Sequence, residues 1–424
     1  MTLSATVAQA GSAAGIASMQ TSKPFSIAAT LRGFYDDNPN GLPKEADIEG
    51  SFGFEINPSI RLSAAMDTTL ATIGYAYSGR YYEENFSGQT DSWRHTHIID
   101  AALQHAIAER YQVYIMDSFV IGQEPDVLRA GTDGYTTYQS ISGDNVRNYG
   151  SLSVSGQLTR QLGFEIGYDN TYWDFEDEGE QFFPNFQASH SGLLDRMEHS
   201  PHVDVTFQMT SQTVGRLGYR YRLVDYTGDE IIGISAAGLV VSEDRNSRSH
   251  YGYAGLDHSF RRDLTGSIRA GARFNDYYND PSNASDWGPY AMLNLNYTYA
   301  QESYVNVGFS YDFNATDVAS VDSTGDFVRD VESAVLYGTL QHRIVPKLYG
   351  SLRGTFQSST YRGGGSNYDG NSDNYYQFGV DVQYRMTEHF STHVGYNFDH
   401  LDSGVPERGD YDRNRVYIGL TASY

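Results

Sequence analysis

The stretch "IEGSFGFEINPSIRLSAAM", residues 48–66, alternates apolar and polar side chains with a period of two. Its even positions are apolar or Gly, such as Phe52 and Phe54, and its odd positions are polar or small, such as Glu49 and Glu55. Successive side chains on a strand point to opposite faces, so the pattern predicts a strand with one apolar and one polar face. At ~3.3 Å per residue it would span roughly 60 Å, whereas most strands have about five or six residues.

The same alternation recurs along the rest of the chain and predicts about 18 strands. The predicted strands are 25–36, 48–66, 70–82, 92–108, 112–123, 147–160, 163–175, 193–210, 213–226, 248–260, 264–277, 287–300, 303–316, 329–344, 348–361, 373–386, 390–402 and 412–424. Pro58 fits the apolar rhythm but has no backbone donor, so we expect a gap or bulge in the strand ladder there.

The connections between these strands alternate in length. Two or three residues suffice at 161–162, 261–263 and 346–347, whereas the stretch "SSTYRGGGSNYDGNSDNYY" contains a long Gly/Asn/Ser loop. An up-and-down transmembrane β-barrel has this organisation, with short periplasmic turns and long extracellular loops. An even number of strands places both termini on the periplasmic side.

Composition is compatible with such a barrel and with a soluble all-β fold. Only 39% of the residues are hydrophobic, the mean hydropathy is −0.50, and no run of about 18 apolar residues predicts a transmembrane helix. A barrel hides its membrane character because only every second residue faces lipid. A propeller would need a recurring motif at about 40–50 residues, which the chain lacks, and shorter strands than these. The pattern therefore favours the outer-membrane barrel.

The net charge is −24, from 53 acidic and 29 basic residues, which argues against nucleic acid as a partner. There is no Cys, so disulfides and thiolate metal sites are excluded. Residues 1–24 contain Ala8-Gln9-Ala10, which has the form of a signal cleavage site, but lack a basic n-region and a full apolar h-region. We predict a leader remnant or flexible periplasmic segment there, and one barrel domain over 25–424.

Four stretches carry a family resemblance: "GFYDDNPN" from Gly33, "DSFVIGQEPDVL" from Asp117, "YRYRLVDYTGDE" from Tyr219 and "DYDRNRVYIGLTASY" from Asp410. With them, the chain from Phe25 to Tyr424 resembles the Putative β-barrel porin type 2 family. The resemblance implies a barrel in the bacterial outer membrane. Some large barrels of this general kind serve exopolysaccharide export. The resemblance implies no catalytic residues.

Charged residues opposite the apolar faces are the candidate pore lining. They are Arg216, Arg220, Arg222, Arg269, Arg273, Arg353, Arg385, Arg415, Glu49, Glu55, Glu165, Asp169, Asp204, Asp312 and Asp381. A mixed lumen of this kind can set up a transverse field that orients polar solutes. Alternatively, these groups pair across strands and only keep the lumen wet.

The long loops are acidic and form a candidate outer mouth with Glu176, Asp177, Glu178, Asp229 and Glu230. Acids at an entrance attract cations, although they are also what solvated loops contain. In the first loop, Asp36, Asn38, Asn40 and Asp47 match the spacing of a calcium loop with Gly41. The twelfth residue is Asp instead of Glu, strands flank the loop, and any hairpin uses such residues.

Catalytic motifs such as G-x-S-x-G and H-E-x-x-H are absent from the sequence, so we expect no enzyme and no cofactor, calcium aside. The expected partners are outer-membrane lipid and lipopolysaccharide, the barrel assembly machinery and, for an exporter, a periplasmic polysaccharide-export protein.

The leading functional hypothesis is a porin-like channel for small hydrophilic solutes with a preference for cations, since barrels of 16–18 strands usually hold an aqueous channel. The second is a translocon for exopolysaccharide export. The third is a plugged structural or surface-binding barrel.

Overall fold

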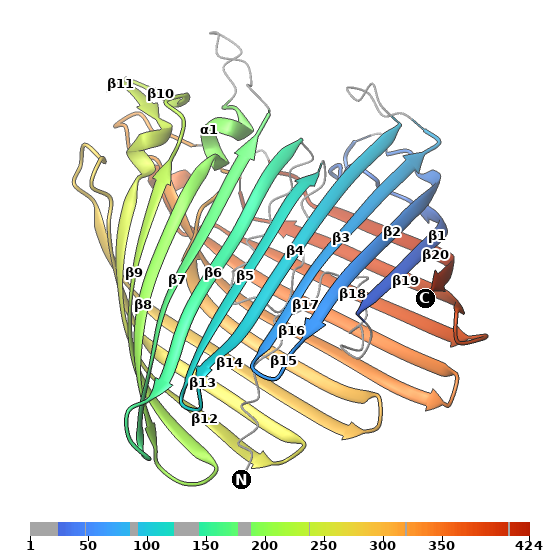
Figure 1. The fold of residues 1–424 in the computed structure, drawn as a ribbon. Helices are drawn as coiled ribbons and strands as arrows, with labels where there is room; N and C mark the ends of the chain where they lie inside the picture. Colours follow the sequence, from blue (N-terminus) through green and yellow to red (C-terminus); the bar gives the residue numbers. More distant parts are fainter. Residues whose placement is uncertain are drawn as a thin grey trace.

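The computed structural model describes residues 24–46, 48–84, 92–122, 144–176, 188–236, 238–318, 320–405 and 408–424. Within these ranges, eighteen antiparallel strands form one sheet that closes on itself, because β1 pairs with both β2 and β20. Each strand otherwise pairs with its neighbours in sequence, and β9 pairs with β12 around a small separate hairpin. Figure 1 shows the strongly tilted strands of this up-and-down barrel.

The strand boundaries agree with the predicted ones to within three residues. The wall consists of β1 (Phe25–Asp36), β2 (Ser51–Ala65), β3 (Thr69–Tyr82), β4 (Trp93–Ala108), β5 (Tyr111–Gly122), β6 (Asn145–Gln157), β7 (Leu162–Phe175), β8 (Arg196–Gln208), β9 (Thr213–Tyr226), β12 (Ser247–Arg261), β13 (Leu264–Asp276), β14 (Ser285–Ala300), β15 (Ser303–Asn314), β16 (Val328–Val345), β17 (Leu348–Gly363), β18 (Ser372–Arg385), β19 (Phe390–Ser403) and β20 (Tyr411–Ser423).

The outside of the wall is apolar. In β1 the side chains of Ile27 and Leu31 are 47% and 55% exposed, and in β20 that of Ile418 is 62% exposed. A soluble protein would have to cover such a continuous apolar surface, whereas a membrane barrel presents it to lipid. Among the described residues, no helix is both long enough and apolar enough to cross a membrane.

Tyrosines and histidines pair across strands at the edges of this apolar surface. The hydroxyl of Tyr77 lies 2.7 Å from Nδ1 of His95, and that of Tyr168 lies 2.6 Å from Nδ1 of His199. Amphipathic rings of this kind mark the interface between lipid tails and headgroups. These pairs are therefore consistent with an outer face that meets a bilayer.

Two local features differ from the sequence prediction, and a third agrees with it. Strand β2 begins at Ser51 instead of Ile48. Leu193 does not begin a strand, because it lies in the short helix α1 (His190–Leu194), whose N-terminus is capped by the hydroxyl of Ser189. At Pro58 the ladder between β2 and β3 has a gap but no register shift, so the expected gap is present and the bulge is not.

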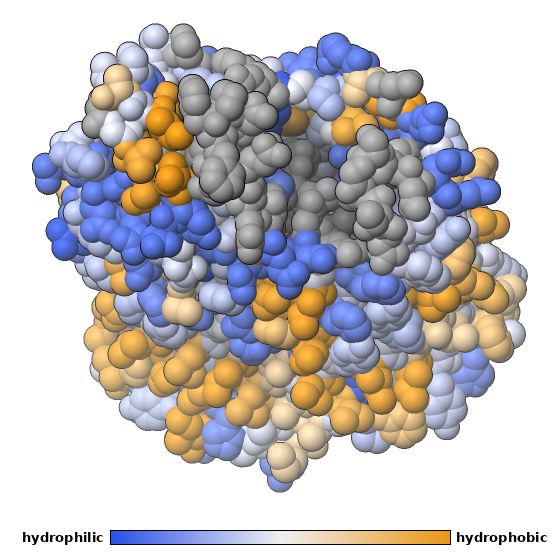
Figure 2. Space-filling view, turned by 90° about the horizontal axis from the view of Figure 1, so that it is seen from above, coloured by the Kyte–Doolittle hydropathy of each residue, from blue (hydrophilic) through white to orange (hydrophobic). Residues whose placement is uncertain are grey.

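The end with the long connections carries a small folded layer, which we call the outer cap. It comprises α1, the hairpin β10 (Ile231–Ser235) and β11 (Gly238–Val241), the 3₁₀ turn η1 (Ser242–Arg245), and the described residues of segment 315–327 between β15 and β16, which are all but residue 319. Leu193, Leu194, Ile232, Val240 and Phe327 form its buried apolar cluster together with Phe175 of β7. Figure 2 views the barrel from this end, with many hydrophilic side chains there and apolar ones on the wall toward the lower edge.

Candidate channel lumen

The polar face of each strand points into the barrel, opposite the apolar outer face. Of the predicted lining residues, all but Glu49 lie on wall strands: Arg216, Arg220 and Arg222 on β9, Arg269 and Arg273 on β13, Arg353 on β17, Arg385 and Asp381 on β18, Arg415 on β20, Glu55 on β2, Glu165 and Asp169 on β7, Asp204 on β8, and Asp312 on β15. Glu49 is a correction: because β2 begins at Ser51, Glu49 is exposed in the loop before it.

One group of these charges is sealed into a buried network beneath the outer cap. Arg273 lies 3.1 Å from Asp330 of β16 and 3.8 Å from Asp312, and its guanidinium stacks on Phe313 at 3.7 Å. Tyr251 of β12 donates a hydrogen bond to Asp312 at 3.2 Å. The side chains of Arg273 and Asp312 are only 4% and 1% exposed. Solutes cannot use groups that are packed in this way.

Arg222 extends the same network. It donates to Glu198 of β8 at 2.6 Å and to the backbone oxygen of Phe313 at 3.1 Å. Arg196 donates to the other oxygen of Glu198 at 2.8 Å. Strands β8, β9, β13, β15 and β16 are thereby linked through side chains on their inner faces.

A second group lies closer to the short turns and remains accessible. Arg216 is the fourth residue of β9 and Arg222 the tenth. Their own side chains are similarly exposed, at 12% and 11%, so the two positions differ in the exposure of their carboxylate partners. The guanidinium of Arg216 contacts Glu165 at 3.4 Å, Asp204 at 3.2 Å and Asp257 of β12 at 3.6 Å. The carboxylates of Glu165 and Asp257 are 32% and 35% exposed. These groups can interact with solutes inside the barrel.

The rest of the wall also carries inner arginines. In strand order β7 and β8 lie half the ring away from β18 and β19. Arg32 and Arg80 share the carboxylate of Glu55 at 3.4 Å and 3.3 Å, and Arg353 is exposed on the inner face of β17. Arg415 contacts Asp36 at 2.9 Å. Arg385 lies at the short-turn rim, where it contacts Glu302 at 3.1 Å.

Two arginines hold segment 315–327 across the outer end. Arg245, which is 1% exposed, donates to the backbone oxygens of Leu193, Thr316 and Val318 at 3.3, 3.0 and 2.7 Å. Arg408, in the connection between β19 and β20, pairs with Asp317 and with Asp373. The segment is thus tied to both sides of the mouth, which explains why the network beneath it is buried.

The part of the predicted acidic mouth that the structure describes is Glu176, Asp229 and Glu230, while Asp177 and Glu178 lie outside the described residues. Glu230 accepts a hydrogen bond from Ser191 at 3.2 Å and lies near Asp195. Burial raises the pKa of Asp195 to about 6, and the nearby carboxylates of Asp174 and Glu230 act in the same direction.

The predicted calcium ligands have protein partners. The carboxylate of Asp36 is held by Arg413 and Arg415, Asn38 bonds Leu42 and the backbone oxygen of Asp412, and Asn40 accepts from Arg94 at 2.6 Å. Asp47 lies outside the described residues. Calcium binding stays a prediction, and the ion would have to displace two arginines.

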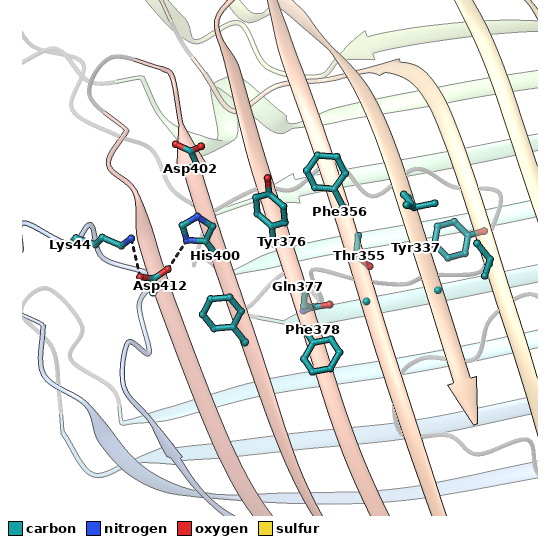
Figure 3. A pocket seen from close by; sticks show the side chains of 15 residues that line it. Lys44, Tyr337, Thr355, Phe356, Tyr376, Gln377, Phe378, His400, Asp402 and Asp412 are labelled. Carbon is teal, nitrogen blue, oxygen red and sulfur yellow. Dashed lines mark hydrogen bonds and ion pairs between the residues drawn. The ribbon is translucent and has the colours of Figure 1, made fainter. Parts of the chain in front are cut away.

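The outer wall has a hollow of about 950 Å³ on β16–β20. It lies where Gly338 pairs with Gly354, so the wall is thin there. Figure 3 shows the rings of Phe356 and Tyr376 in this hollow, with Lys44, Asp412 and His400 joined in a row at one end. Its apolar residues belong to the outer face, so this hollow belongs to the lipid side of the wall.

Sequence reasoning missed several members of the network. Glu198 and Asp330 lie near strand ends, where the alternation is hard to assign. His202 of β8 shares the inner face with Asp204, two residues on, and this spacing was the available signal. Arg245 lies in an irregular turn that offers no periodic signal.

Several solved outer-membrane proteins resemble the fold. OccAB4 of Acinetobacter baumannii has a TM-score of 0.43 and 11% identity, and the match covers 96% of this chain and 100% of that one. OpdK of Pseudomonas aeruginosa gives 0.43 and 12%, covering 94% and 99%. A BenF-like porin of Pseudomonas fluorescens Pf-5 gives 0.43 and 12%, covering 95% and 99%. No curated protein matches the sequence.

The closed wall and its apolar belt, together with a family match, identify a porin-like β-barrel of the bacterial outer membrane. The match lies in the C-terminal part of the chain and includes β12–β20. Residues 240–424 match the model of the family described as Putative beta-barrel porin 2, which confirms over this part of the chain the resemblance predicted from the sequence.

Proposed function

We propose that the barrel is a channel for small hydrophilic solutes and that it prefers cations. The observation that carries this proposal is the accessible set of inner charges near the short turns, around Arg216, Glu165 and Asp257 on one side and Arg353 on the other. Closed walls of 16–18 strands leave room for an aqueous path.

The distribution of these charges supports a transverse field. Glu165 and Asp169 lie on β7, while Arg32 and Arg353 lie on β1 and β17, on the other side of the ring. A polar solute with separated charges would be oriented between the two walls. A solute that is both polar and compact fits this arrangement best.

The cation preference rests on the net charge of −24 and on the acidic mouth. Negative charge at an entrance raises the local concentration of cations, and salt screens the effect over ~10 Å at 0.1 M. The preference should therefore be strong at low salt and fade toward 1 M. Polysaccharide export and a plugged barrel receive no support from the comparisons.

Planar-bilayer recording tests the proposal. We expect stepwise conductance, with a reversal potential that indicates cation selectivity at low salt. The triple variant E176Q/D177N/E178Q should weaken the selectivity while leaving the channel open. The control D67N/E388Q removes acids at the short-turn end and should change it less. Anion selectivity at low salt would show that the inner arginines control passage, and silent bilayers would contradict conduction itself.

A further inference from the structure

We propose that the lumen wall carries a binding site for a divalent transition-metal ion, formed by Glu165 of β7 and by His202 and Asp204 of β8. The three potential ligand atoms lie within 4.8 Å of one another, and no other such His/Asp/Glu group occurs in the described part of the chain. One imidazole and two carboxylates suit Zn²⁺ and similar ions better than Ca²⁺ or Mg²⁺. This inference goes beyond conduction and does not depend on it.

Two glycines shape the site. A Cβ on Gly167 would lie 2.3 Å from Cε1 and Nε2 of His202, and one on Gly218 would lie 2.3 Å from Oδ1 of Asp204. Because both positions are Gly, the imidazole and the carboxylate can lie flat against the neighbouring strand. The ring of His202 comes to rest between two acids, with Nε2 at 3.9 Å from Glu165 and Nδ1 at 3.5 Å from Asp169.

One potential ligand atom at this site is incompletely satisfied. Nδ1 of His202 is buried and makes no hydrogen bond with any described residue, and the carboxylate that it faces, that of Asp169, lies 3.5 Å away. The side chain of His202 is only 10% exposed. Buried polar atoms normally have a partner, and a metal ion would use the lone pairs that hydrogen bonds leave free.

The local charge favours a cation. Three carboxylates, those of Glu165, Asp204 and Asp257, contact the guanidiniums of Arg216 and Arg269, and a fourth, that of Asp169, lies beside His202. Even when Arg220, which pairs with His202 across the strands, is counted, acids outnumber arginines by four to three. This surplus of one negative charge attracts a cation.

Arg216 is the internal competitor for the ion. Its Nη1 lies 3.4 Å from Glu165 and 3.2 Å from Asp204, where the metal would have to bind. Its Nη2 also contacts Asp257 at 3.6 Å. When an ion takes Glu165 and Asp204, Arg216 can stay paired with Asp257, so metal binding leaves the guanidinium with a partner.

His393 of β19 provides a matched control. It is the other lumen histidine on a wall strand of the described chain, and it also lies over a glycine, since a Cβ on Gly419 would be 2.0 Å from its Nε2. That nitrogen lies 3.2 Å from Nε–H of Arg32, which donates to it, and the one carboxylate near Nδ1 is Asp381 at 3.8 Å. Around His393, Arg32 thus lies at the nitrogen Nε2, whereas around His202 the carboxylate of Glu165 lies at that nitrogen.

The test is calorimetric titration of Zn²⁺ into the purified, folded barrel in detergent at neutral pH. We expect one saturable site in the wild-type protein. H202A and the conservative variant E165Q should each weaken it by at least about tenfold, since even indirect changes at metal sites have effects of about 10–100-fold. H393A should leave it unchanged, and R216Q should tighten it because the competing cation is removed.

Folding of each variant is checked by its heat-modifiable migration on gels. The proposal is overturned if wild-type protein shows no saturable Zn²⁺ binding, or if H202A and E165Q bind as the wild type does, because the ion would then lie elsewhere, for example on the acidic loops. Weaker binding by R216Q would overturn the role of Arg216 as a competitor. The titration measures binding and needs no ion flow through the barrel. A protein that fails to conduct can therefore still show the metal site, and a protein without the metal site can still conduct.

Discussion

Arg273 and Arg269 lie four residues apart on the inner face of β13, yet their surroundings differ completely. Arg273 is 4% exposed and is held by Asp330, Asp312 and the ring of Phe313. Arg269 is 21% exposed and contacts one half-exposed partner, Asp257, at 3.4 Å. The charged groups at the outer end of the lumen are thus buried as in a protein core. Those near the short turns remain accessible to water, and only they can interact with passing solutes.

The largest expected effect is a difference between substitutions of these two arginines in the free energy of unfolding. Removing one partner of a buried, hydrogen-bonded pair costs about 3–5 kcal/mol, whereas an accessible pair contributes roughly 0–1 kcal/mol. We expect R273A to lower the free energy of unfolding strongly and R269A to change it little. Denaturant unfolding of barrels in lipid vesicles measures both values. Equal losses in the two variants would mean that the network and the accessible set do not differ energetically.

The next effect concerns membrane assembly, and it compares a substitution on the outer face of the wall with one on the inner face. Leu352 is 39% exposed on the outer face of β17, and Ser351 beside it faces the lumen opposite Asp381. An arginine at the bilayer midplane costs ~2–4 kcal/mol, so L352R should impair membrane assembly. S351R should assemble much better because the new charge meets water and a carboxylate. Folding yield into vesicles provides the measurement, and similar yields would favour two equally buried faces.

A smaller effect concerns the outer cap, which seals the buried network. The pKa of Asp195 is raised to about 6 in the folded protein by burial, above the ordinary value of 3.8. The folded state therefore binds this proton more tightly than the unfolded state, and the contribution is fully present at low pH and lost as the pH rises through about 6. The cap should open more readily at pH 7 than at pH 5.

Hydrogen exchange of residues 188–196, corrected for the intrinsic pH dependence, tests this expectation. D195N keeps an acceptor for the backbone N–H of Phe175, which bonds Asp195 at 2.7 Å, but cannot ionise. In this variant the difference between pH 5 and pH 7 should disappear. A difference that persists in D195N would assign the effect to another group, and the short turns should show no comparable dependence in either protein.

The wall could be predicted from the sequence because alternation is a local signal. Ile418 and Leu352 are outward, and Arg216 and Glu165 inward, for the same reason of parity along a strand. Parity cannot tell Arg216 from Arg222, which share a face of β9. Their partners differ in exposure, and that difference depends on the outer cap, whose anchors such as Arg245 lie in irregular segments. The contacts of those segments are set by tertiary packing and leave no periodic trace.

Spacing also does not predict the protein contacts of Glu49 and of Asp36, the first residue of the predicted calcium loop. Both predictions placed polar groups by spacing alone, at the end of the wall where strands stop and loops begin. In the structure Glu49 lies outside β2, and Asp36 is used by Arg413 and Arg415. Once the ladder of strands ends, nearby chains decide which group a carboxylate meets.

The central claim is that a water-filled path passes the accessible end of the lumen. It is tested most directly by two neighbouring cysteine variants, R353C and L352C, in a protein that has no other Cys. Both are recorded as single channels while a charged, water-soluble methanethiosulfonate is added. We predict that modification of R353C changes the conductance in one step and that L352C, which faces lipid, shows no change. Equal responses of the two variants, or no conductance in either, would contradict the account.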